Sequence, residues 1–362
     1  MIADQPSALR KRSNAADWLP ITTSDLLQAA QALTQHRHRQ ALRTRIVDTE
    51  DIYDEFNHGN ADLGAIWRFL KFTQNRWRTA PRYVLLAGEG SFDYKNYLGH
   101  GNSLIPTLLA PTPQGLSPSD NLYAYVQSND SLPEMAIGRL PVINAGELEE
   151  ASAKLIAYES STGTWTRTVT FATDPADDAG DFPADSDAMA ANVPADYILE
   201  HINLDEFEAP ADAGMQLLDS LRDGRAFLNF SGHGGFTALG NFNLLTAAQV
   251  PQLDNAQRLP IITALTCLTG NFGFPGQESI GEVLVLNPHV SAAAIWAPTG
   301  LSRNDGARLL GDEFYQAVFG ARERIISDAI RASQARFVRD GGDPYLLDIY
   351  NLIGDSATVM RH

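Results

Sequence analysis

The sequence predicts an α/β fold built on a parallel sheet, because short apolar segments alternate with helical ones along most of the chain. The apolar runs are five to eight residues long, rich in Ile, Leu, Phe and Thr, and often closed by glycine. This pattern is typical of strands that are buried on both faces. Strands that alternate with helices in this way lie parallel to one another in one sheet.

The first part of the chain shows this order most plainly. Strands are predicted at 16–22, 43–47 and 82–87, and helices at 25–33 and 62–77. The second helix carries apolar residues at helical spacing, and the last strand breaks on two glycines. The Pro- and Ser-rich run at 106–120 interrupts the pattern and is long enough to be a functional loop or a subdomain junction.

The alternation continues through the second part of the chain. The expected strands end near 138–141, 172, 231 and 265, with another at 291–297, and the expected helices cover 146–160, 211–222, 304–319 and 321–338. We therefore divide the chain into a linker-like tail at 1–13, an N-terminal α/β subdomain at 14–130 and a larger subdomain at 131–360.

Composition excludes several classes of function. The chain has 362 residues and a formal net charge of −17, which repels phosphate backbones and anionic lipid surfaces, so we expect no nucleic-acid partner. No apolar run is long enough to span a membrane, and residues 1–16 are too polar for a signal peptide. A single cysteine excludes an internal disulfide and leaves the compartment undecided.

Two predicted strands end on reactive side chains. The runs at 226–235 and 259–272 carry His233 and Cys267 at their ends. Ligands bind outside the carboxyl ends of parallel strands, so both side chains would face one crevice. A lone cysteine is more often a small core residue, and a lone histidine a satisfied polar one. Together, an imidazole that accepts a proton and a nucleophilic thiol are the two parts of a cysteine hydrolase.

The residues around the pair strengthen this interpretation. Glycines on both sides of His233, at 232, 234 and 235, let its backbone approach a substrate closely, and the turn at 269–271 lifts Cys267 clear of its strand. Here the chain resembles the gingipain-type cysteine peptidases, peptidase family C25, which belong with the caspase-like peptidases. The resemblance covers nearly the whole chain and includes, in family order, V-D-T-E-D-I-Y-D-E-F at 47–56, Y-V-L-L-A-G-E-G-S-F-D-Y at 83–94, S-D-N-L-Y at 119–123, A-I-G-R-L-P-V at 136–142 and Y-N-L-I-G-D at 350–355.

The resemblance implies a caspase-like three-layer fold, a parallel sheet with helices on both faces, preceded by a smaller α/β subdomain. One departure is Thr266, where these peptidases often have Ala or Ser before the nucleophile. The resemblance also implies that Cys267 is the nucleophile, that His233 is the general base and acid, and that the backbone N–H groups of Gly234 and Cys267 stabilise the oxyanion. It places Glu134 one strand over from His233 as the orienting group, although a surface glutamate at a strand start is an equally ordinary reading.

For specificity, the resemblance implies cleavage after Arg or Lys, with Glu147 in the first specificity pocket. The wall of this pocket would come from the loop after the 291–297 strand, with Trp296, Thr299 and the following residues to Ser302. The alternative for Glu147 is a glutamate that favours the positive end of its own helix. The partner would be a protein or peptide substrate, no cofactor would be needed for the chemistry, and the chain would be secreted or cell-surface. The oligomeric state is left open.

Other functions are weighed against this one. The acidic run at 174–187 is expected to be a solvated loop, although it could hold a structural calcium ion despite lacking EF-hand spacing. The turn G-E-G-S-F-D at 88–93 is neither a nucleophile elbow nor a complete dinucleotide fingerprint. The rivals are a non-proteolytic module that keeps the fold, and a nucleotide- or sugar-binding α/β domain.

Overall fold

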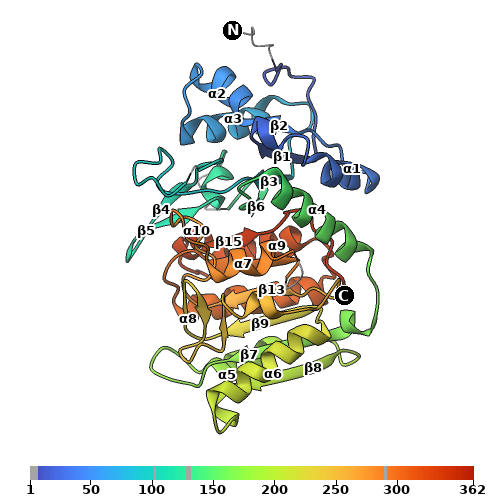
Figure 1. The fold of residues 1–362 in the computed structure, drawn as a ribbon, viewed down its shortest axis with the longest axis vertical. Helices are drawn as coiled ribbons and strands as arrows, with labels where there is room; N and C mark the ends of the chain where they lie inside the picture. Colours follow the sequence, from blue (N-terminus) through green and yellow to red (C-terminus); the bar gives the residue numbers. More distant parts are fainter. Residues whose placement is uncertain (1–6, 102, 128–131, 289–291) are drawn as a thin grey trace.

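The computed structural model describes residues 7–101, 103–127, 132–288 and 292–362 (Figure 1). Ten strands form one sheet along the length of the molecule, and helices flank it, so the predicted α/β fold class is confirmed. The strand order is β2 (Val47–Asp48), β1 (Trp18–Thr22), β3 (Tyr83–Ala87), β6 (Ala136–Leu140), β15 (Tyr350–Ile353), β14 (Ala294–Pro298), β13 (Ile261–Leu265), β9 (Phe227–Ser231), β7 (Thr168–Thr173) and β8 (Ile198–Asn203).

The strand β15 joins two sets of parallel strands that run in opposite directions. It pairs in parallel with β6 through Ile353 and Arg139, and antiparallel with β14 over four residue pairs. The strands β1, β2, β3 and β6 therefore point their carboxyl ends to one rim of the sheet, and β14, β13, β9, β7 and β8 point theirs to the other rim. We call these the N-terminal rim and the C-terminal rim.

The helices cover both faces of the sheet (Figure 1). They are α1 (Gln31–Arg39), α2 (Thr49–Asn57), α3 (Leu63–Arg76), α4 (Ala145–Ser160), α5 (Phe182–Ala190), α6 (Pro210–Asp223), α7 (Ile280–Leu286), α8 (Asn304–Tyr315), α9 (Ile326–Arg339) and α10 (Tyr345–Ile349). Helices cover both faces because successive side chains of a strand point to opposite faces of the sheet. In β1, Trp18 packs in the core that contains α1 and α4, whereas Leu19 and Ile21 pack in a second core with α2 and α3.

Small strands complete the structure. The glycines after β9 form β10 (Gly234–Gly235), which builds a three-stranded sheet with β11 (Ala238–Leu239) and β12 (Leu245–Thr246). The interrupting run at 106–120 folds into a hairpin of β4 (Leu108–Thr112) and β5 (Gly115–Ser119). The helix predicted at 25–33 was placed too early, because Ser24–Leu26 forms a 3₁₀ turn and α1 begins only at Gln31.

Three sequence predictions include residues outside the described ranges. The boundary between the subdomains at 130 and 131 lies outside them, as does residue 291 at the start of one predicted strand and the first part of the tail at 1–13. The division into subdomains stays a prediction. The described residues show β6 paired with β3 over five residue pairs, so the sheet continues without a break across this part of the chain.

A buried arginine ties these segments together. Arg139, at the end of β6, is fully buried and donates two hydrogen bonds of 2.6 and 2.7 Å to the Asp120 carboxylate. It also donates to the carbonyls of Gly88 and Ile105. A Cβ at Gly90 would lie 2.7 Å from the Arg139 guanidinium, and a Cβ at Gly88 would lie 3.0 Å from the Ile105 side chain, so close packing explains both glycines without a ligand.

Candidate active site

The register of two adjacent strands brings His233 and Cys267 to equivalent positions. The strands β9 and β13 are parallel, with Ser231 opposite Leu265, and the ladder continues through a bond from Gly232 N to Leu265 O. His233 and Cys267 each lie two residues beyond this pair, on the C-terminal rim. Both line one small cavity of about 50 Å³. The two reactive side chains are therefore neighbours, although they are 34 residues apart in sequence (267 − 233).

The acidic run after β7 holds the histidine. This strand lies on the other side of β9, and Asp174 follows it directly. The Asp174 carboxylate, which is 1% exposed, accepts hydrogen bonds from His233 N at 2.8 Å and Asn241 N at 3.2 Å. Burial raises the pKa of this carboxyl group, against the lowering effect of the two N–H donors. Asp174 thus fixes the backbone of the histidine.

Asp177 fixes the imidazole ring. Its Oδ2 lies 2.7 Å from His233 Nε2, and a tight turn to Gly180 together with the N–H of Ala179 holds the carboxylate in place. The Ala179 hydrogen bond and the His233 contact lower the pKa of Asp177, so it is an ionised acceptor. An acceptor at this distance requires the proton on Nε2, which leaves the lone pair of a neutral ring on Nδ1. The rings of Phe182 and His233 also pack nearly at right angles, with their centroids 5.4 Å apart.

The thiol of Cys267 lies against the loop after β14. Ser302 N lies 3.4 Å from the sulfur and Ser302 O lies 3.6 Å from it. Burial raises the pKa of the Cys267 thiol, and the Ser302 N–H opposes this effect. Leu268, the next residue, has a left-handed backbone with φ +59°, which turns the chain sharply away from the strand.

Gly234 brings the histidine turn against the cysteine strand. A Cβ at this position would overlap Thr266 Oγ1 and lie 3.0 Å from the Cγ2 atoms of Thr266 and Thr269. His233 O accepts a hydrogen bond from Gly240 N, so the following pair in the hairpin, Gly234 with Leu239, is a non-hydrogen-bonded pair. The Gly234 N–H therefore points away from β11. An oxyanion donor needs this free direction, and the role of Gly234 and of Cys267 N–H stays a prediction.

Glu134 is not next to His233. It precedes β6, which lies four strand positions from β9, roughly 19 Å at 4.8 Å per strand. Its Oε2 accepts a hydrogen bond from Val126 N at 2.8 Å. The prediction that Glu134 lies one strand over from His233 was wrong, because β15, β14 and β13 all lie between β6 and β9. Asp177 occupies the place at the imidazole that Glu134 was expected to take.

Glu147 acts on its own helix. It lies in the first turn of α4, where its carboxylate accepts hydrogen bonds from Ile143 N at 2.8 Å and Asn144 Nδ2 at 2.9 Å. The Asn144 side chain in turn accepts from Glu147 N. This reciprocal capping follows the carboxyl end of β6, on the N-terminal rim, away from Cys267. The structure therefore contradicts the placement of Glu147 in a pocket beside the thiol.

Trp296 and Thr299 are also remote from the cavity surface. Trp296 is 1% exposed, donates to Tyr350 O at 3.2 Å and packs between aromatic rings in the core. Thr299 is fully buried and donates to Pro118 O. These two predicted wall residues are wrong because their side chains point into the core, whereas Ser302, at the end of the same predicted loop, does line the cavity. The cavity is lined instead by Ala179, Phe182, Gly232, His233, Leu265, Thr266, Cys267, Ser302, Asn304 and Ala307.

The acidic run at 174–187 spreads its carboxylates over separate partners. No group of three or more His, Cys, Asp or Glu side chains is arranged to hold a metal ion in the described part of the chain. Its carboxylates have separate partners: Asp181 caps α5 through Ala184 N, and Asp185 accepts from Asn304 Nδ2 at 2.8 Å. The expectation of a solvated loop is wrong for Asp174, which is buried beneath His233. Its place after a buried strand was the signal that could have pointed to it.

A thiol and an oriented imidazole at neighbouring strand ends of an α/β sheet define the class of cysteine hydrolases. Comparison with protein families gives the particular group: the model of peptidase family C25 matches residues 11–361, and the chain belongs to this family of cysteine-type peptidases. The predicted resemblance is therefore confirmed.

Known relatives agree with this assignment. Gingipain R2 of Porphyromonas gingivalis ATCC 33277 is 23% identical over 343 residues, covering 90% of this chain and 43% of the relative. Gingipain R1 of Porphyromonas gingivalis is also 23% identical and is covered to 32%. The chain thus spans less than half the length of these relatives.

Solved structures show the same fold. The crystal structure of the Arg-specific cysteine proteinase gingipain R (RgpB) superposes with a TM-score of 0.80 at 20% identity, over 97% of this chain and 79% of that one. The complex of Porphyromonas gingivalis RgpB pro- and mature domains gives 0.78 at 21% identity, over 95% and 79%. In the present structure, no helix within the described ranges has the length and hydropathy needed to cross a bilayer.

Proposed function

We propose that this chain is a cysteine endopeptidase that cleaves peptide bonds through Cys267 and His233. The observation that carries the proposal is the register of β9 and β13, which sets both side chains on one cavity at equivalent strand ends. Asp177 completes the arrangement by orienting the ring through Nε2. A nucleophile, a base and an orienting acceptor are the three roles that such a site requires.

The geometry supports a definite sequence of steps. Nδ1 of His233 accepts the thiol proton as the Cys267 sulfur attacks the scissile carbonyl carbon, because the raised thiol pKa disfavours a thiolate before substrate binds. The oxyanion forms beside the Gly234 and Cys267 N–H groups. Collapse expels the amine, which takes the proton from His233, and leaves an acyl-enzyme. Water, deprotonated by His233, then hydrolyses the thioester.

Labelling with a peptidyl electrophile tests the dyad. We expect the intact protein to be modified once, at Cys267, and the rate to fall steeply in His233→Ala. In that variant, labelling should rise only above pH 9.0, the ordinary value from which burial raises the pKa of this thiol. Circular dichroism should show that Cys267→Ala and His233→Ala keep the fold. Equal labelling rates in the intact protein and His233→Ala would favour the non-proteolytic module instead.

We further propose that the substrate carries Arg or Lys before the scissile bond. The structural similarity to gingipain R, an Arg-specific proteinase, supports this, and so does Asp185 behind the cavity wall. Its carboxylate also forms an ion pair with Arg308 at 3.3 Å. A cavity of about 50 Å³ is too small for a basic side chain, so Asn304 must move when such a substrate binds.

A peptide library provides the test of specificity. Asp185→Asn should lower kcat/KM for Arg and Lys substrates and hardly affect a neutral substrate that is still cleaved. Glu147→Gln is the matched control, because its carboxylate caps α4. No preference for basic residues in the intact protein would remove this part of the proposal and leave the dyad untouched.

Two further expectations remain proposals. Secretion or cell-surface location rests on the resemblance to gingipains, and fractionation of the source cells with an antibody would test it. A structural calcium ion is tested by comparing the melting temperature in calcium and in a chelator, and an unchanged value would argue against it.

A further inference from the structure

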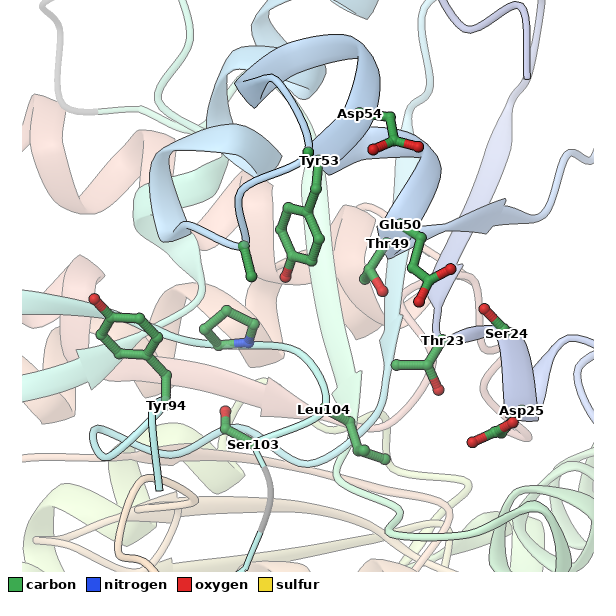
Figure 2. A pocket seen from close by; sticks show the side chains of 13 residues that line it. Thr23, Ser24, Asp25, Thr49, Glu50, Tyr53, Asp54, Tyr94, Ser103 and Leu104 are labelled. Atoms are coloured by element: carbon green, nitrogen blue, oxygen red, sulfur yellow. The ribbon is translucent and has the colours of Figure 1, made fainter. Parts of the chain in front are cut away.

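A second and larger cavity lies in the N-terminal part of the molecule. It has a volume of about 590 Å³, within the range of ordinary ligand sites. It shares no lining residue with the cavity of Cys267. Figure 2 shows Thr49 and Tyr53 pointing from α2 toward the loop that carries Ser103 and Leu104. The lining residues are Thr23, Ser24, Asp25, Thr49, Glu50, Tyr53, Asp54, Gly59, Ala61, Tyr94, Ser103, Leu104 and Pro106.

The cavity occupies the place where this kind of sheet binds ligands. Its walls come from the segments that follow β1, β2 and β3, at their carboxyl ends. In the order β2-β1-β3-β6, the strand after β1 is added on one side of it, and β3 is then added on its other side. Where the order of strands changes sides in this way, the loops that leave β1 and β3 diverge and a crevice opens between them. Because β15 reverses the strand direction, this crevice lies on the N-terminal rim, and Cys267 lies on the C-terminal rim.

The walls are acidic and rich in hydroxyl groups. Three carboxylates line the cavity, and its lining, all of it in the described part of the chain, contains no Lys, Arg or His. Among the described residues, the exposed carboxylates of Asp25 and Glu50 form no ion pair or side-chain hydrogen bond. Tyr53 and Tyr94 add two aromatic rings. This set of groups complements a cation that donates hydrogen bonds.

A threonine side chain that is otherwise buried presents its hydroxyl to the cavity. Thr49 is 3% exposed, and its side chain lines the cavity. Its hydroxyl forms no hydrogen bond within the described ranges, and its oxygen is not one of the fully buried unpaired atoms there, so the hydroxyl is open to the cavity. A hydroxyl in this position offers a hydrogen-bond acceptor to a ligand in the cavity.

An anion fits this site poorly. The N-terminus of α2 opens onto the cavity and by itself would favour negative charge. Asp48 already caps this end through Glu50 N, and Glu50 and Asp51 lie in the first turn. Three carboxylates at the helix start satisfy the dipole. With Asp25 and Asp54 also on the walls, a phosphate group would meet net repulsion.

We infer that the cavity at the β1/β3 crevice binds an organic cation, an ammonium or guanidinium group on a flexible chain. The cation would lie between Asp25 and Glu50, with the Thr49 hydroxyl as a further acceptor. A free diamine or a basic side chain of a peptide carries this chemistry. The site is separate from the catalytic cavity, so the inference does not rest on the proposed peptidase activity.

Calorimetry with the full chain carrying Cys267→Ala tests the inference, because nothing is cleaved during the measurement. The probes are agmatine, a blocked Arg tripeptide and the same peptide with citrulline, which keeps the shape of arginine without its charge. We expect saturable binding that weakens with added salt, and hydrogen exchange that slows in residues 49–54. Binding of agmatine would identify a free amine as sufficient, and binding of the Arg peptide alone would identify a peptide.

Matched variants locate the binding. Asp25→Asn with Glu50→Gln should weaken binding about tenfold, since two charge partners are lost together. Glu150→Gln removes one charge from an exposed position on α4 and should change nothing. Thermal melts check that all variants fold. Equal binding of the citrulline peptide, or full binding by the Asp25/Glu50 variant, would overturn the inference, because binding would then not depend on these charges.

Discussion

Substitution of Gly234 by alanine should disable the site while leaving the fold intact. The added Cβ would overlap Thr266 Oγ1 and lie 3.0 Å from two methyl carbons, whereas carbon atoms in contact prefer about 3.5–4.0 Å. To remove this overlap, the turn that carries His233 must shift by roughly 0.5–1 Å relative to the strand that ends at Cys267. Because misplacement of about 1 Å costs on the order of 100-fold in rate, we expect kcat/KM to fall by about that factor.

The chain provides both a control and a rescue for this substitution. At Gly235 an added Cβ meets nothing within 4 Å, so Gly235→Ala should keep most of the activity. Thr266→Ala removes the clashing atoms and should restore much of the loss in a double variant. The assay is hydrolysis of a fluorogenic peptide, with melting temperatures measured in parallel. Full activity in Gly234→Ala would refute the idea that the close approach of Gly234 to Thr266 requires a glycine. A double variant that folds normally but does not recover kcat/KM would refute it as well.

Three more predictions follow from contacts described above. Asp177→Asn should lower kcat/KM about five- to tenfold, because a charged hydrogen bond to a half-exposed carboxylate contributes about 1 kcal/mol. Asp178→Asn is the control and should have no effect. Equal losses in the two variants would show that Asp177 does not orient the imidazole. Arg139→Met leaves Asp120 buried and unpaired and should lower the free energy of unfolding in urea by about 3–5 kcal/mol. Burial raises the pKa of Glu282 to about 8, above an unfolded value near 4.5, so the folded state binds the extra proton and stability should fall from pH 5 to pH 8. Glu282→Gln should flatten that decline in melting temperature, and an equal slope in both proteins would contradict the buried proton.

Local sequence predicted both dyad residues because each one directly follows the end of its own strand. The apolar runs before His233 and Cys267 fixed where each strand ends, and the glycines after them fixed where the chain turns. Parallel strands then bring their ends to the same rim. What remained to be learned was only that β9 and β13 are neighbours in register.

Strand order is what the sequence did not reveal. Glu134 was assigned by assuming that its strand lies beside that of His233, but β15 lies between β6 and β14. A four-residue strand from the far end of the chain has no local signature of where it pairs. Asp177 was missed for the related reason that its role depends on β7 lying beside β9 and on the turn at 177–180.

At Glu147, the local sequence was a better guide than the family resemblance, because this residue caps its own helix and does not lie in a specificity pocket. The sequence N-A-G-E after a strand is an ordinary helix start, with Asn144 and Glu147 three residues apart, and the structure shows these two side chains bonded to the helix start. The larger cavity near β1 had no motif, because its walls come from three loops that meet only in the folded chain.

The central place of β15 has a consequence for how the molecule assembles. Every other strand of the sheet leaves the ribosome before Tyr350–Ile353. The edges of β6 and β14 that pair with β15 therefore remain without backbone partners until this last strand is made. Such open edges pair readily with other chains, and closing contacts over long sequence separations slow folding. A chaperone that shields these edges until the last strand arrives would therefore set the yield of soluble protein, and peptides that copy residues 350–353 would compete for the same gap.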